Sequence, residues 1–290
     1  MFLQLLLLIF GVFAGSTAVI MIKASALHPV LLSSLRLLVA TLALSPFFIR
    51  DYRAHSKEYT WSHLRGSLLP GILLALHFMT WITGARMTPA ANASIIVNMV
   101  PLVMPFLLLA LTGERVIGRE CVGTVVAFSG ILILAISDFD VSPQYFWGDV
   151  ICFVSMVFFA CYLALGRKNR HFPTVWLYLV PLYLIAGLIC LIGAFFVATP
   201  FQAYPPREIA LVLGLGIVPT VLGHSTLNYS MKHLRGQLVS IVNIAQFIFA
   251  GTMGYVFYNE VPGWTFLPTS LLFVVGAWLA ITAQPGSEEA

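Results

Sequence analysis

The sequence predicts an all-α integral membrane protein with ten transmembrane helices, arranged as two inverted five-helix repeats. Three observations lead to this fold class: the composition, the spacing of the uncharged runs, and a correspondence between the two halves. Of the 290 residues, 60% are hydrophobic and 9% are charged, and the mean hydropathy is +0.95. A soluble domain carries about a quarter charged residues. The composition therefore excludes a soluble enzyme, a nucleic-acid-binding protein and a disordered scaffold.

Ten uncharged or nearly uncharged runs are long enough to form helices that cross a membrane. Such a helix needs about 20 mostly apolar residues. The runs also lack the alternation of apolar and polar residues that marks membrane β-strands. The predicted helices cover residues 2–22, 29–49, 66–86, 91–111, 119–137, 147–166, 173–198, 207–230, 237–257 and 264–283.

The basic residues predict that both termini lie in the cytoplasm. In that orientation the inside loops receive eleven of the fifteen Lys and Arg residues, and the outside ends receive only Lys23, Arg86 and Arg207. Such an excess of basic residues is typical of cytoplasmic loops. It also accounts for the net charge of +4 without a nucleic-acid partner. The first helix lacks the basic segment of a signal peptide, so we expect it to be retained.

The two halves of the sequence correspond when one is shifted by about 145 residues; a shift of 146 pairs Thr80 with Thr226. Because each half holds an odd number of helices, the second half enters the membrane from the opposite side, which makes the repeat inverted. We assign the repeats to residues 1–140 and 141–290. Inverted repeats are typical of alternating-access transporters, whose substrate site lies near the membrane midplane.

Two segments at matching positions carry a family resemblance: ARMTPAANASIIVNMVPLVMPFLLLALTGE at residues 85–114 and HLRGQLVSIVNIAQFIFAGTMGYVFYNE at residues 233–260. They resemble the EamA-type repeat of the drug/metabolite transporter superfamily, and SSLRLLVATLAL around Arg36 is similar to the arginine-bearing second helix of its first repeat. The resemblance implies a ten-helix exporter in a bacterial inner membrane, closest to exporters of aromatic and other neutral amino acids. The chain departs from the pattern near Gln246, where the second repeat usually has a proline. The resemblance thus supports a kink in helix 91–111 more than in helix 237–257.

His77 and His224 lie 147 residues apart, at matching positions inside predicted helices. A histidine in lipid is costly unless it faces a polar cavity, so we expect both to point inward. There they either bond to a neighbouring helix, contact the substrate or carry a proton. Trp81 shares a helix face with His77, with Thr80 beside it. Its indole is either an anchor at the membrane interface or an aromatic wall against the substrate.

Two polar stripes run along helices 91–111 and 237–257. Amides and hydroxyls provide donors and acceptors without charge, which suits the two charged groups of a zwitterion. The alternative is hydrogen bonding between helices. The full set of predicted substrate-binding residues is His77, Thr80, Trp81, Ser94, Asn98, His224, Asn228, Ser240, Asn243 and Gln246.

Arg36 is the one charge well inside a predicted span, about 10 Å from its outer end at 1.5 Å per residue. It either extends to the outer interface or binds a carboxylate, which is that of the substrate or of Glu260. In helix 91–111, Pro101 and Pro105 free backbone carbonyls and predict a hinge or a fixed kink.

No Asp or Glu falls in the middle of a predicted helix. Ion-driven carriers often bury such a carboxylate, so we expect facilitated exchange or downhill export, or coupling to protons through histidine. The chain has no P-loop and no clustered acid, base and metal-binding set of the kind that a membrane-embedded enzyme needs. The four cysteines form no CxxC pair, and we expect neither a disulfide nor a metal nor a cofactor.

The sequence thus favours a secondary transporter that exports a neutral amino acid or related small metabolite. The alternative within the same class is an exporter of drugs or other metabolites coupled to protons through histidine, and the alternatives from other classes are a membrane-embedded enzyme and a scaffold. Its partners would be that small molecule and the lipid bilayer. A monomer would suffice, and a dimer is allowed.

Overall fold

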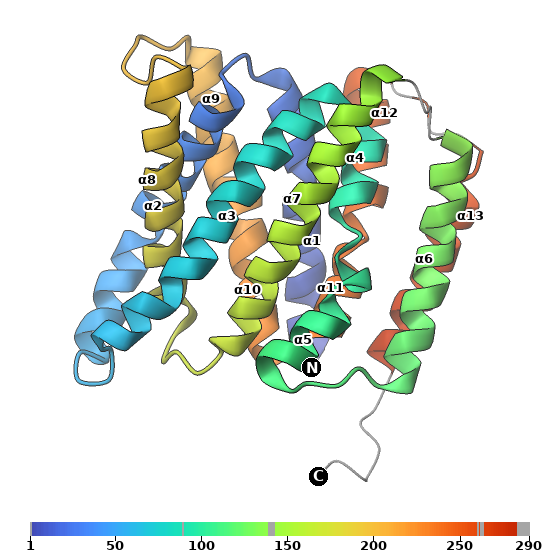
Figure 1. Cartoon of the computed structure of the whole chain (residues 1–290), viewed down its shortest axis with the longest axis horizontal. Helices are drawn as coiled ribbons and strands as arrows, with labels where there is room; N and C mark the ends of the chain where they lie inside the picture. The colour runs from blue at the N-terminus through green and yellow to red at the C-terminus, as the bar shows by residue number, and fades with distance from the viewer. Residues whose placement is uncertain (1, 89, 139–142, 260, 262–263, 283–290) are drawn as a thin grey trace.

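A computed structural model describes residues 2–88, 90–138, 143–259, 261 and 264–282 (Figure 1). All regular secondary structure in these residues is helical, in agreement with the predicted all-α class. The elements are α1 Phe2–Ala24, α2 Pro29–Ala54, α3 Trp61–Met87, α4 Ala90–Val97, η1 Val100–Leu102, α5 Met104–Thr112, α6 Gly118–Asp138, α7 Pro143–Lys168, α8 Val175–Val197, α9 Pro206–Leu215, η2 Gly216–His224, α10 Ser225–His233, α11 Gly236–Asn243, α12 Gln246–Tyr258 and α13 Phe266–Ile281. The element η1 is a short 3-10 helix, whereas η2 is a π-helix.

Within the described residues, seven helices or runs of joined helices are long and apolar enough to cross a membrane. An eighth span results if α4, η1 and α5 are taken together. The run 206–233 joins α9, η2 and α10, and the run 236–258 joins α11 and α12. The chain is therefore an α-helical membrane protein, as predicted, and the count of ten spans stays a prediction.

The helices predicted over 91–111, 207–230 and 237–257 are each interrupted. Between α4 and α5 the chain bends by 45°, at a segment where Pro101 and Pro105 cannot donate backbone hydrogen bonds. In the second case Pro219 lies inside the π-helix η2, which absorbs the missing bond in a wider turn. The third interruption lies between Asn243 and Gln246, without a proline.

The helices form one bundle in which α2 packs along α8, and α3 packs against α7 and α8 (Figure 1). Helix α1 runs through the middle and contacts η2, α10 and α12. Helices α6 and α13 pack chiefly on each other and lie as a pair at one side. Helix α1 begins, and α13 ends, at the same end of the bundle, the lower end in Figure 1.

Small residues let α1 approach η2 closely. A Cβ atom at Gly223 would lie 2.9 Å from the backbone nitrogen of Gly15 and 3.3 Å from the carbonyl oxygen of Gly11. Glycines spaced by four residues allow this kind of backbone contact between membrane helices. The contact brings the π-helix beside the part of α1 that faces the centre of the bundle.

Charged side chains form hydrogen bonds between the ends of neighbouring helices on the side of the bundle where α5 and α7 terminate. Glu114 accepts hydrogen bonds from Arg167 Nε at 2.7 Å and from the backbone N–H of Gly236 at 3.0 Å. Glu120 accepts one from Arg235 Nε at 2.6 Å. These acids thus lie at helix ends, as the sequence predicts, and leave the middle of the bundle to uncharged polar groups and Arg36.

Candidate functional site

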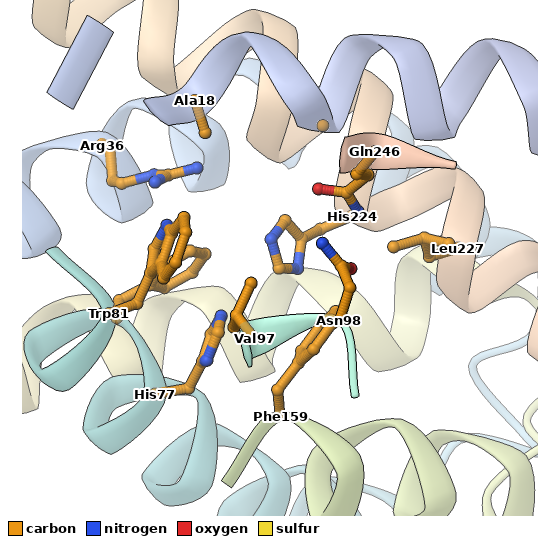
Figure 2. A pocket seen from close by; sticks show the side chains of 12 residues that line it. Ala18, Arg36, His77, Trp81, Val97, Asn98, Phe159, His224, Leu227 and Gln246 are labelled. Carbon is orange, nitrogen blue, oxygen red and sulfur yellow. The ribbon is translucent and has the colours of Figure 1, made fainter. Parts of the chain in front are cut away.

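A pocket lies where the interrupted helices meet α1, α2, α3 and α7 (Figure 2). The volume open to the centre of a water molecule is about 30 Å³, and all the space between the lining atoms, including space open to the surroundings, is about 400 Å³. Its lining residues are Gly15, Ala18, Arg36, His77, Phe78, Trp81, Val97, Asn98, Phe159, His224, Leu227 and Gln246. The sequence singles out six of these: Arg36, His77, Trp81, Asn98, His224 and Gln246.

The two predicted histidines face each other across the pocket, with ring centroids 6.1 Å apart. His77 Nδ1 lies 2.9 Å from Ser155 Oγ and 3.1 Å from the Ser155 carbonyl oxygen. Its ring stacks on Phe159 at 4.7 Å between centroids. His224 Nδ1 is buried and has no hydrogen-bond partner among the described residues. His77 is thus fixed to α7, whereas His224 keeps an unused polar atom beside the pocket.

Arg36 is completely buried, so the interpretation that it extends to the outer interface is wrong. Its Nε and Nη2 atoms donate to Thr220 Oγ1 at 3.0 and 2.9 Å. The guanidinium carbon lies 4.2 Å from the centroid of the Phe78 ring, a cation–π contact. Its Nη1 atom has no partner in the described part of the chain. The carboxylate expected from Glu260 lies outside the described residues.

The π-helix η2 places Thr220 against Arg36. Thr220 Oγ1 also donates to the carbonyl of Leu215 at 2.7 Å, which fixes the hydroxyl that accepts from the guanidinium. A Cβ atom at Gly216 would lie 3.1 Å from the Arg36 carbonyl oxygen, so the backbones of α2 and η2 approach each other closely here. The wide turn and the glycine together bring a hydroxyl within reach of the arginine.

Amide side chains link the interruption between α4 and α5 to the interruption between α11 and α12. Gln246 Nε2 donates to Asn243 Oδ1 at 2.6 Å, and Asn243 Nδ2 donates to Asn98 Oδ1 at 2.9 Å. Asn98 Nδ2 in turn donates to the Ser94 carbonyl at 2.7 Å. Asn98 and Asn243 are 145 residues apart, the shift at which the two halves of the sequence correspond. We call Asn98, Asn243 and Gln246 the amide ladder.

The structure places several predicted site residues away from the pocket lining. The hydroxyls of Thr80 and Ser240 donate to backbone carbonyls of their own helices. Asn228 Nδ2 donates to the Tyr162 hydroxyl and to the His224 carbonyl. Ser94 takes part through its backbone carbonyl. Of these contacts, the one between Asn228 and Tyr162 joins two helices, α10 and α7.

Pro101 and Pro105, the predicted hinge, lie in η1 and in the first turn of α5. Pro101 is buried, and its carbonyl accepts from Gln237 Nε2 at 3.2 Å. Trp81 is 7% exposed and points toward the pocket in Figure 2, which rules out the alternative of an interfacial anchor.

Sequence reasoning missed Thr220 and the apolar lining residues. Phe78 follows His77 directly, and Phe159 lies on another helix, but nothing in the spacing separates them from the other phenylalanines. Among the described residues, no three His, Cys, Asp or Glu side chains form a group that could hold a metal ion.

The sequence model of the EamA-like transporter family matches residues 1–136 and 146–282. An uncharacterized transporter from Archaeoglobus fulgidus is 24% identical over 261 residues, which cover 85% of this chain and 84% of that protein. The pseudopaline exporter CntI of Pseudomonas aeruginosa is 25% identical over 212 residues, 72% of each chain. A crystal structure shares the fold with a TM-score of 0.75 at 20% identity, with 96% of each chain covered.

Proposed function

The chain belongs to the EamA-like transporter family, and on that premise we propose that it is a secondary transporter that exports aromatic or other neutral amino acids, or related small metabolites. The observation that carries this proposal is the pocket between two interrupted helices, where amides from both halves meet. Interrupted helices around a midplane site are typical of alternating-access carriers.

The chemistry of the lining supports a partly apolar substrate. Trp81, Phe78 and Phe159 offer aromatic surface on which a planar side chain stacks. Asn98 and Gln246 offer donors and acceptors without charge. No described Asp or Glu lines the pocket, which favours flux without a buried-carboxylate coupling site and disfavours a cationic drug.

We further propose that the spans number ten, in two inverted repeats at residues 1–140 and 141–290. The two matches of the family's sequence model, one in each half, support this division. So do the interruptions that α4–α5 and α11–α12 share. The proposed location is a bacterial inner membrane with both termini in the cytoplasm. One chain contains residues from both halves of the pocket, so a monomer suffices.

The test is uptake of labelled phenylalanine, tryptophan, threonine and a cationic drug into liposomes that hold the purified protein, with and without a pH gradient. We expect saturable amino-acid flux that persists without the gradient. Flux of the drug alone would contradict the proposal. Flux only with the gradient would instead favour proton coupling, for which His224 Nδ1, without a partner in the described part of the chain, is the candidate.

Two variants and a matched control locate the flux in the pocket. His77→Ala and Gln246→Ala remove lining side chains, and we expect each to lower the flux about tenfold or more. Thr83→Val is the control, because the Thr83 hydroxyl donates only to the Met79 carbonyl of the same helix. Equal flux in all three variants would place the transport path elsewhere.

A further inference from the structure

Arg36 is a charged side chain in the pocket lining to which the described residues supply no opposite charge. The side chain is completely buried, and its partner is a hydroxyl, Thr220 Oγ1, which bears no net charge. Removing an ion from water is energetically costly, so buried charges are normally paired. Here one donor atom, Nη1, has no partner among the described residues.

The acids that the described helices bury are bound elsewhere. Asp51 accepts from Arg50, Glu120 from Arg235, Asp149 from Thr88 and Glu208 from Ser25. None of these carboxylates lines the pocket. The balancing charge for Arg36 therefore does not come from them.

A second unused polar atom lies beside the same space. His224 Nδ1 is buried without a partner among the described residues, and its ring centroid is 4.9 Å from that of Phe78. The guanidinium of Arg36 lies over the same Phe78 ring. Figure 2 shows Arg36 and His224 both directed into the pocket, from α2 and η2. An arginine donor and an imidazole thus flank one aromatic surface.

We propose that Arg36 and His224 form a carboxylate subsite, and that the transporter selects its substrate by that negative group. The inference rests on the proposed function, because it names the chemical class of what the same pocket carries. A guanidinium suits a carboxylate through its planar fork of donors. Thr220 is a positioning residue, since its hydroxyl holds two of the guanidinium nitrogens and leaves Nη1 for the substrate.

The proposed subsite predicts that the carboxylate of an amino acid, and not its ammonium group, determines binding. No described acid lines the pocket, so the ammonium has no charged partner there. A 2-oxo acid, which lacks the amino group, should bind as well as the amino acid. An amine that lacks the carboxylate should not bind.

The first experiment measures binding directly. The unfolding midpoint of the purified full-length chain in detergent is compared with phenylpyruvate, phenylalanine or phenethylamine at equal ionic strength. We expect the two carboxylates to raise the midpoint and phenethylamine to leave it unchanged. Stabilisation by phenethylamine, or none by either carboxylate, would overturn the subsite. Because this assay needs no flux, it can succeed where the transport proposal fails, and the reverse.

Variants then locate the effect at Arg36. R36Q should lose the stabilisation by both carboxylates. Its midpoint without ligand should match or exceed that of the wild type, because the variant removes a buried charge that has no charged partner among the described residues. If R36Q unfolds at lower temperature and still prefers carboxylates, Arg36 serves the fold alone.

The positioning role of Thr220 has its own pair of variants. T220V removes the hydroxyl and should weaken carboxylate binding about tenfold, whereas T220S keeps the hydroxyl and should restore it. T41V is the matched control on α2, since the Thr41 hydroxyl donates only to the Leu37 carbonyl. Equal carboxylate affinity in T220V and T220S would remove Thr220 from the subsite.

Discussion

The helix predicted over 91–111, which carries Asn98, and the helix predicted over 237–257, which carries Asn243, are both interrupted, but their backbones are interrupted in different ways. Between α4 and α5 the interruption covers residues 98–103, contains Pro101 and bends the chain by 45°. Between α11 and α12 it covers only residues 244–245, contains no proline, and leaves one candidate span over 236–258. At both interruptions a backbone N–H donates to the carbonyl oxygen three residues earlier in the chain. Examples are the bond from Asn98 N–H to the Ile95 carbonyl and the bond from Ala245 N–H to the Val242 carbonyl.

The difference shows two ways of keeping a helix open. Proline has no backbone N–H, so the first interruption lacks a helical hydrogen bond whatever the surrounding side chains are. The second interruption contains no proline, and side chains of the amide ladder make its polar contacts. We therefore expect the second interruption to depend on side chains much more than the first.

The largest effect should come from Asn243→Leu. The substitution removes the link between the interruptions and leaves Asn98 Oδ1 and Gln246 Nε2 without this partner. We expect the free energy of unfolding to fall by about 1–3 kcal/mol, measured by denaturation in detergent. Ser240→Ala is the control on the same helix, with an expected change below about 0.5 kcal/mol. Equal stability of the two variants would mean that the ladder does not hold the second interruption.

A smaller effect on stability, but a clear one on flux, should follow from Pro101→Ala combined with Pro105→Ala. Restored backbone donors favour a straighter helix, so the unfolding midpoint should stay the same or rise. Transport should slow about threefold to tenfold if the bend is part of the conformational cycle. The rate of exchange in liposomes measures this, and an unchanged rate would identify the bend as a fixed kink without a hinge role.

A loss of stability smaller than that of Asn243→Leu should come from Gln237→Met, which tests a second link between the two regions. Gln237 Nε2 donates to the Pro101 carbonyl and, at 2.8 Å, to Thr124 Oγ1. We expect a loss of about 1 kcal/mol in the free energy of unfolding. In a double-mutant cycle with Asn243→Leu the two losses should not add, because both residues join α11 to the interruption at residues 98–103. Simple additivity would show that the links are independent.

The helical membrane class and the family resemblance are confirmed, because both depend on signals that run along the chain. Long uncharged runs reveal membrane helices directly. The resemblance rested on residues 85–114 and 233–260, and the family match covers both. The predicted helices were bounded by charged residues and were therefore too short. Helix α2 continues to Ala54 beyond the predicted end at residue 49, and α3 begins at Trp61 before the predicted start at residue 66.

The pocket was partly predictable for a simple physical reason. Arg36, His77 and Asn98 are polar side chains in apolar helices, which are costly unless they face one another or a cavity. Phe78 and Phe159 carry no such signal, since the chain has 22 phenylalanines. Thr220 required the π-helix, whose register the sequence does not reveal. Ser240 was assigned to the site because its type fits, although its hydroxyl is satisfied by its own helix.

The contact between Arg36 and Thr220 also bears on how the chain enters the membrane. The two residues are 184 positions apart, so the hydroxyl that receives the guanidinium is synthesised long after α2. At about 5–20 residues per second the delay is roughly 10–40 seconds. An arginine near a helix centre costs about 2.5–3.5 kcal/mol on insertion. During that interval the hydroxyl of Thr220 cannot yet receive the guanidinium, so the apolar residues of α2 must offset the cost of inserting Arg36.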